Sequence, residues 1–198
     1  MNVGASSPEE YGDYFAWGET EPYYEAGYAH SESPVWKSGK ESGYYWPSYK
    51  WCNGDSNKLT KYCTKSNYWD GTGPMDNKTV LDPDDDAAHV NWGGNWRMPT
   101  KAEQDELRNN CTWTWTTQGG KNGYKVTSKT NGNSIFLPAA GYRDGTILYS
   151  VGSFGLYWSS SLYSGSPYYA CYVGFSSDGC NWDDSDRYRG LSVRPVSE

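Results

Sequence analysis

The sequence predicts an α+β fold with two short helices, antiparallel strands and long irregular loops, and three observations support this prediction. The 198 residues include 23 Gly and 10 Pro, which favour many turns over long helices. Helix-start signals occur between residues 82 and 110, and alternating patterns typical of strands occupy the chain from residue 111 onward. The 11 Trp, 19 Tyr and 4 Phe argue against disorder, although the mean hydropathy is -0.89. The length fits a single domain, residues 1–198.

Residues 1–80 are predicted to form loops rather than regular elements. Aromatic residues alternate there with Gly, Ser, Pro and Asn, as in Tyr44-Tyr45-Trp46-Pro47, and no helical period is present. Because each ring buries a large area, we expect compact irregular structure in which most rings are core.

The first helix is predicted to begin at Pro83, with Asp82 as its cap and the acidic residues 84–86 in its positive first turn. The same acidic run mimics the start of an EF-hand calcium loop. However, Ala87 replaces the turn glycine, and Gly93 stands where the bidentate Glu is required. We therefore interpret the run as an acidic helix start.

The second helix carries a stronger start signal. Thr100 and Glu103 form the capping-box pattern, in which each side chain bonds the other residue's backbone N–H. The helix is predicted to continue through Leu107 and to end near residues 109–110.

Strands are predicted after the second helix. Cys111, Trp113 and Trp115 alternate with threonines, as in a half-buried strand. Turns are expected at residues 119–120 and 122–123, and Asn131-Gly132 predicts a hairpin between residues 124–128 and 134–137. The remaining strands are expected at residues 147–149, 156–159, 169–175, 180–183 and 191–196.

Charge and hydropathy exclude several classes of partner. The chain has 17 Lys and Arg against 24 Asp and Glu, and its net charge of -7 argues against nucleic acid or an anionic membrane surface. No apolar run is long enough to span a membrane, so we expect no direct membrane insertion. The first residues, 1–4, lack the pattern of a signal peptide.

Common catalytic and cofactor motifs are missing, including Gly-x-Ser-x-Gly, His-Glu-x-x-His and the Walker loop. The five cysteines form no CxxC pair, and His30 and His89 are far apart, which argues against structural zinc. A nucleophilic Cys171 or Cys180 would need a histidine base, and we expect His89 to be packed and hydrogen-bonded instead. The prediction is therefore no catalytic residue, no metal and no cofactor.

A hairpin is predicted at residues 169–183, with its turn at Ser177-Asp178. Period-2 alternation divides its side chains between two faces. The core face is expected to carry Cys171, Val173, Phe175, Cys180 and Trp182. The exposed face is expected to carry Tyr172, Gly174, Asn181 and Asp183, and to continue into residues 184–186, Tyr188 and Arg189. Tyr, Ser, Asn and Gly are typical of recognition surfaces. An ordinary polar sheet face is the alternative, as is a solvated acidic loop at Asp183, Asp184 and Asp186.

Several ordered blocks of the sequence carry a family signature. Residues 96–103 resemble the Trp-Arg-(Met/Leu)-Pro-Thr-x-x-Glu signature of the Fibrobacter succinogenes major paralogous domain family, common in gut Bacteroidetes. Matches to its other blocks are residues 2–5, 11–19, 136–142, 157–161 and 190–196. The resemblance implies a C-type lectin-like fold, which is related to formylglycine-generating-enzyme-like domains.

The resemblance also implies a function. Members of this family include variable proteins of diversity-generating retroelements, whose adenine-directed mutagenesis rewrites Asn codons into codons for Tyr, Asp, Ser, Gly, Cys or Arg, but never Trp. We therefore expect a non-enzymatic ligand-binding protein, diversified at about residues 142–190, with Trp158 and Trp182 as fixed scaffold. The candidate ligand-binding residues are Arg143, Asp144, Phe154, Leu156, Leu162, Tyr163, Ser166, Tyr168, Tyr169, Tyr172, Gly174, Asn181, Asp183, Asp184, Ser185, Asp186, Tyr188 and Arg189.

The expected partner is a protein or a cell-surface molecule, and the expected location is extracellular, on the cell surface or on a phage virion. Three alternatives stay open. A calcium-dependent glycan lectin would need a Glu-Pro-Asn triplet, for which Glu21-Pro22-Tyr23 is a poor substitute. A formylglycine-generating-type enzyme would need a reactive cysteine pair, and the predicted hairpin sets Phe175, not Cys171, opposite Cys180. A structural adhesin or fimbrial tip subunit would differ from the expected binding protein only in what it is attached to.

Family members usually carry a strand upstream of the Asn-Val-Gly block, and that strand pairs with the C-terminal strand. This chain begins at Met1-Asn2-Val3. We therefore expect residues 191–196 to form an unpaired edge, which would invite pairing with another chain.

Overall fold

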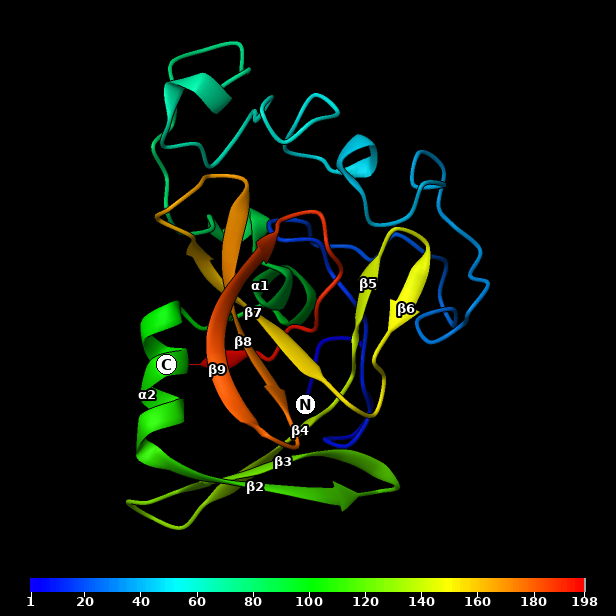
Figure 1. Cartoon of the computed structure of the whole chain (residues 1–198), viewed down its shortest axis with the longest axis vertical. Helices are drawn as coiled ribbons and strands as arrows, with labels where there is room; N and C mark the ends of the chain where they lie inside the picture. Colours follow the sequence, from blue (N-terminus) through cyan, green and yellow to red (C-terminus); the bar gives the residue numbers. More distant parts are fainter. Residues whose placement is uncertain (198) are drawn as a thin grey trace.

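Most of the regular structure is antiparallel β-sheet (Figure 1), seen in a computed structural model that describes residues 1–197. The helices are α1 (Ala87–Trp92) and α2 (Lys101–Asn110), with 3-10 turns at Trp46–Ser48, Ser66–Tyr68 and Pro83–Asp85. The strands are β1 (Trp96–Arg97), β2 (Cys111–Gln118), β3 (Lys121–Ser128), β4 (Ser134–Pro138), β5 (Tyr142–Asp144), β6 (Ile147–Tyr149), β7 (Gly155–Leu162), β8 (Tyr169–Ser176), β9 (Gly179–Asp186) and β10 (Val196–Ser197). The predicted α+β class is confirmed.

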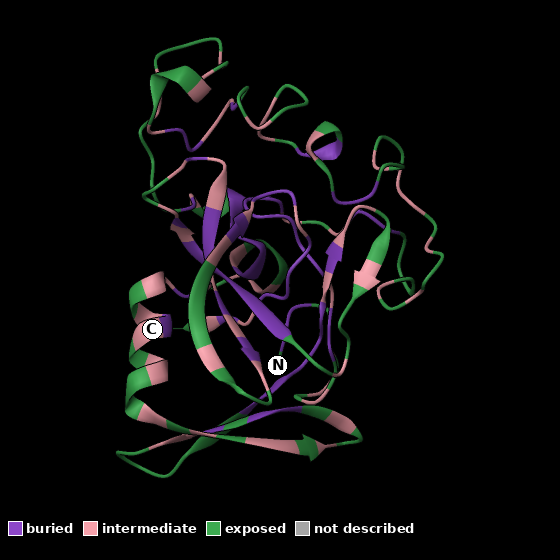
Figure 2. Cartoon of the chain, in the orientation of Figure 1, coloured by how far each residue is buried: buried purple, intermediate pink, exposed green. Residues whose placement is uncertain are grey.

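The strands form small sheets with the orders β7-β8-β9, β2-β3-β4, β5-β6 and β1-β10. The β7-β8-β9 sheet is central, α2 runs beside it, and the β2-β3 ribbon crosses below it (Figure 1). Helix α2 contacts β7, β8 and β9. Along this sheet, β7 is buried almost throughout, whereas β9 is largely exposed (Figure 2). The edge strand β9 therefore offers its side chains to solvent while β7 belongs to the core.

Residues 1–80 are irregular, as predicted, and aromatic rings hold them in place. The rings of Tyr23 and Tyr44 are stacked with their centroids 4.3 Å apart, and both side chains are buried. The hydroxyl of Tyr14 donates to the carbonyl of Ala140 at 2.6 Å and so ties this region to the segment before β5. The Tyr23 hydroxyl donates to the Glu19 carboxylate and the Tyr44 hydroxyl donates to the Tyr14 carbonyl, so both of these buried rings keep a hydrogen bond.

The capping box of α2 is confirmed, because the Thr100 hydroxyl accepts from the Glu103 N–H and the Glu103 carboxylate accepts from the Thr100 N–H. The start of α1 differs from the prediction: Pro83–Asp85 is a 3-10 turn, and the cap is Asp86 rather than Asp82. Asp86 accepts from two α1 N–H groups and from the Met98 N–H, which satisfies its buried carboxylate. Asp82 is paired with lysines instead.

The predicted turn at residues 122–123 is wrong, because both residues lie inside β3 and the turn is made by Gly119-Gly120 alone. Gly123 pairs with Thr116 on one side and Pro138 on the other. A Cβ on Gly123 would lie 2.3 Å from the Leu137 carbonyl oxygen. The glycine therefore permits a close approach of strands rather than a turn.

The expected unpaired C-terminal edge is also corrected. Only Val196–Ser197 of this region is a strand, and it pairs with β1. Leu191 exchanges backbone hydrogen bonds with Phe15, and the Val3 N–H donates to the Val193 carbonyl at 3.0 Å. The beginning of the chain thus occupies the edge that was expected to be open.

Candidate functional site

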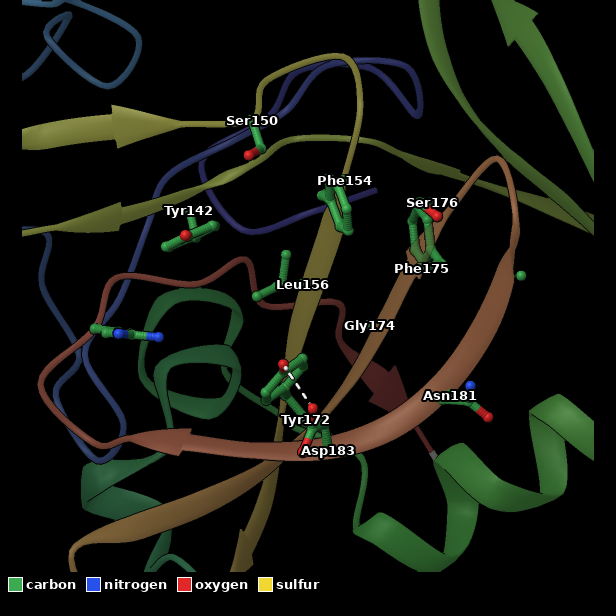
Figure 3. A pocket seen from close by; sticks show the side chains of 12 residues that line it. Tyr142, Ser150, Phe154, Leu156, Tyr172, Gly174, Phe175, Ser176, Asn181 and Asp183 are labelled. Carbon is green, nitrogen blue, oxygen red and sulfur yellow. Dashed lines mark hydrogen bonds between the residues drawn. The ribbon is translucent and has the colours of Figure 1, made fainter.

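A cavity of about 370 Å³ opens between the β8-β9 hairpin and the connection from β6 to β7 (Figure 3). It lies on the sheet face that carries Tyr172 and Asp183. Its lining residues are Tyr142, Ser150, Phe154, Leu156, Tyr172, Gly174, Phe175, Ser176, Gly179, Asn181, Asp183 and Arg189. Seven of the predicted ligand-binding residues are among them: Phe154, Leu156, Tyr172, Gly174, Asn181, Asp183 and Arg189.

The register of the β8-β9 hairpin sets this face. Phe175 is opposite Cys180, and Tyr172 is opposite Asp183, as the alternation predicted. The strands end at Ser176 and Gly179, which leaves Ser177-Asp178 as the turn. Asn181 and Asp183 are exposed, and Tyr172 is half-buried.

Aromatic rings form the walls of the cavity. Tyr172 packs edge-on against the buried Trp158, with centroids 6.1 Å apart, and Tyr142 stacks on Tyr149 at 5.4 Å. Phe154 is 47% exposed at the rim. A Cβ at position 174 would lie 2.8 Å from the Tyr172 ring, so Gly174 leaves room for that ring to lie along the strand.

The charged groups at the cavity are unevenly paired. The Arg189 guanidinium lies 2.9 Å from the Asp144 carboxylate and also donates to Ser185 Oγ. Asp183 accepts from the Asp184 N–H at 2.9 Å and, over a long 3.5 Å, from the Tyr172 hydroxyl. No Lys, Arg or His in residues 1–197 forms an ion pair with Asp183. The cavity thus holds a carboxylate without a counter-ion.

Burial and the Asp183 charge determine how neighbouring groups titrate. Burial, and then the nearby Asp183 carboxylate, raises the pKa of Tyr172 to about 12. The same two causes raise the pKa of Asp184. Burial raises the pKa of Asp186, with Asp144 and Asp184 adding to the effect and Arg189 opposing it. This end of β9 therefore crowds negative charge.

Four further candidates form a separate cluster at the loop between β7 and β8. The rings of Tyr168 and Tyr169 are 4.3 Å apart, and Tyr68 lies 5.4 Å from Tyr168. The ring centroids of Tyr163 and Tyr169 are 6.5 Å apart. The carbonyl of Ser166 accepts a hydrogen bond from the Tyr169 N–H. None of these four candidates lines the cavity.

Five predicted contact residues, Arg143, Leu156, Leu162, Ser185 and Tyr188, are below one-tenth exposed. Leu156 nevertheless contributes to the cavity floor. The other four do not line the cavity, and their assignments as contact residues are corrected. Arg143 donates to the carbonyls of Ala29 and Ser31 at 2.9 and 2.8 Å and so anchors the N-terminal loops.

Trp182 is 40% exposed, so its predicted place in the core is wrong. Its partner across the ladder is the buried Val173, as expected from the alternation. However, β9 is the edge strand, and the cover on that side is α2, whose Lys101 ammonium lies 4.2 Å from the indole centroid. A flexible lysine covers less of the ring than a packed core would.

Lining residues that the sequence did not single out come from β5, from the β6–β7 connection and from the end of β8. Ser150 and Ser176 supply hydroxyls, and Tyr142 supplies a wall. Ser150 has a left-handed backbone with φ of 58°, which is uncommon outside glycine. Alternation reveals faces within one hairpin, but the β6–β7 connection meets this face only through the tertiary fold.

The cysteines are free, and Cys171 and Cys180 are not opposite one another, since Cys171 faces Asp184. Burial raises the pKa of each of these two thiols to about 11. Within residues 1–197, no three His, Cys, Asp or Glu side chains are grouped so as to hold a metal ion. No helix in the described chain is long and apolar enough to cross a membrane.

A domain family of unknown function, DUF8237, matches residues 111–196. This stretch runs from the start of β2 to the first residue of β10 and contains every residue that lines the cavity. No curated protein and no solved structure matches the chain.

Proposed function

We propose that this protein is a non-enzymatic ligand-binding protein that displays a diversified recognition surface, as a variable protein of a diversity-generating retroelement. One observation carries the proposal: the cavity face is built from side chains that alternate with core residues on the same two strands. Tyr172 and Gly174 line the cavity, while Val173 between them is 3% exposed and does not line it. Apart from the buried Leu156 and Phe175, which form the cavity floor, partner recognition and folding therefore rest on different side chains.

This division explains how such a surface tolerates change. The β8-β9 ladder is held by backbone hydrogen bonds, which do not depend on the side chains of the exposed face. Substitutions at exposed positions usually change stability by about 0.5 kcal/mol or less. Exchanging Asn181 or Asp183 thus alters the surface and leaves the scaffold intact.

The resemblance of ordered sequence blocks to the Fibrobacter succinogenes major paralogous domain family supports the proposal, and with it a C-type lectin-like fold. The buried Trp158 fits the part of fixed scaffold. Trp182 is partly exposed, but codon rewriting never produces tryptophan, so this residue also fits the part of fixed scaffold. A protein or cell-surface molecule outside the cell is the proposed partner.

The DNA next to the gene tests the retroelement part of the proposal. We expect a near-identical copy of the coding stretch for about residues 142–190, differing at adenines, together with a reverse-transcriptase gene. A locus with neither would contradict diversification and leave a static surface domain.

A further inference from the structure

We propose that the cavity beside β8 and β9 binds a basic side chain, arginine or lysine, presented by a protein partner. The inference rests on the proposed function, because it names the chemistry that this same face recognises.

The walls suit the stem and head of a basic side chain. Tyr142, Phe154 and Tyr172 supply rings, and Leu156 and Phe175 supply an apolar floor. Ring faces attract cations within roughly 6 Å, and the attraction grows when the cation is desolvated. The methylene stem of Arg or Lys packs on apolar surface while its charged end reaches a polar group.

Asp183 supplies that polar group. Its backbone position is fixed by the pairing with Tyr172, and the Tyr172 hydroxyl lies 3.5 Å from its Oδ2. Figure 3 shows the two side chains next to each other at one side of the cavity. A guanidinium or ammonium bonded there would complete a charge-assisted hydrogen bond that the protein alone leaves unmade.

The charges near the cavity favour a cation over an anion. Asp183 and Arg189 are the charged residues that line the cavity, and the Arg189 guanidinium is already held by Asp144. Arg108, which donates to the lining Asn181, is likewise paired with Asp105. The raised pKa of Asp184 reflects burial and the Asp183 charge, and a bound cation would relieve that repulsion.

The size of the cavity fits one side chain of a larger partner. Its volume of about 370 Å³ is at the small end of the roughly 300–1,000 Å³ of ligand pockets. Its open, mostly exposed rim at Phe154 and Asn181 allows the partner's backbone to stay outside.

The test titrates the whole protein with N-acetyl-arginine amide and N-acetyl-lysine amide, and follows backbone amides and the Asn181 side-chain amide by NMR. N-acetyl-citrulline amide is the neutral match for arginine. We expect shifts confined to the cavity, with citrulline binding about tenfold more weakly, since the cation supplies most of the attraction. Shifts centred on the Tyr168 cluster, equal binding of citrulline, or no shifts at millimolar probe would overturn the proposal.

Two variants make the test specific. D183N should weaken the arginine probe about tenfold, whereas D178N, which removes the same charge from the exposed turn outside the cavity, should leave it unchanged. Equal effects of D183N and D178N would mean that only net charge matters, which refutes a site.

The result is separable from the proposed function. If the locus varies at the cavity codons but the basic probes do not bind, this inference fails and the recognition surface stands. If the probes bind but the gene carries no template repeat, the cavity stands and diversification fails.

Discussion

Replacing Trp158 or Trp182 by phenylalanine separates scaffold from surface within one sheet. Trp158 is fully buried, and its indole N–H donates to the Phe15 carbonyl at 2.8 Å. Trp182 is 40% exposed, and its indole N–H has no partner in the described chain. The two changes are chemically identical, so their difference in effect reports the environment.

The magnitudes follow from these contacts. W158F removes the indole hydrogen bond to the Phe15 carbonyl, which still accepts from the Leu191 N–H, and the loss of one such bond costs about 0.5–1.5 kcal/mol. The lost part of the ring is equivalent to about two methylenes at about 0.8 kcal/mol each. We therefore expect W158F to reduce the free energy of unfolding by about 2–3 kcal/mol, and W182F by less than about 1 kcal/mol.

Urea unfolding followed by far-UV circular dichroism measures both, and it does not depend on tryptophan emission. With a slope near 2 kcal/mol per molar urea, W158F should lower the midpoint by about 1–1.5 M, and W182F by less than about 0.5 M. Equal losses, or a W158F loss below about 1 kcal/mol with an unchanged slope, would refute the assignment of scaffold and surface.

Three further predictions concern charge and thiols. Glu103, whose pKa is lowered from 4.5 to about 2 chiefly by its hydrogen bond with Arg97, stabilises the fold above pH 4.5, and this stability is lost as the pH falls toward 2. The gap in stability between wild type and E103Q should therefore close over that window, and a gap that stays constant down to pH 2 would contradict the pairing of Glu103 with Arg97. Burial raises the pKa of the Cys171 thiol from 9.0 to about 11. Cys171 should therefore react with iodoacetamide about a hundredfold more slowly in the native than in the unfolded protein at pH 7.5, and equal rates would contradict its burial. Once a protein partner is found, its binding should survive chelator, and its association should be faster at low salt. Loss of binding in chelator would favour the calcium-lectin alternative. A salt-independent association rate would remove Asp183 from the site.

Local patterns in the sequence predicted the central elements well. The capping box at Thr100 and Glu103 and the register of the β8-β9 hairpin depend on neighbouring residues, and both are present. The alternation also correctly predicted that Asn181 and Asp183 are exposed and that Val173 and Phe175 are buried.

The misplaced residues depend on partners far away in the chain. Arg143 is buried because loop carbonyls more than one hundred residues earlier accept from its guanidinium. Tyr188 is buried because Trp46, in an irregular loop, packs on it at 5.1 Å. Trp182 is exposed because its strand has no neighbour on one side. A pattern of one strand contains none of this information.

Sequencing this one gene from many cells of a single population shows whether the cavity face is diversified. We expect amino-acid changes concentrated at positions of the cavity face, such as Tyr172, Asn181 and Asp183. We expect none at the buried positions of Trp158 and Val173. Changes spread evenly over exposed and buried codons, or an invariant cavity face, would contradict diversification of this face.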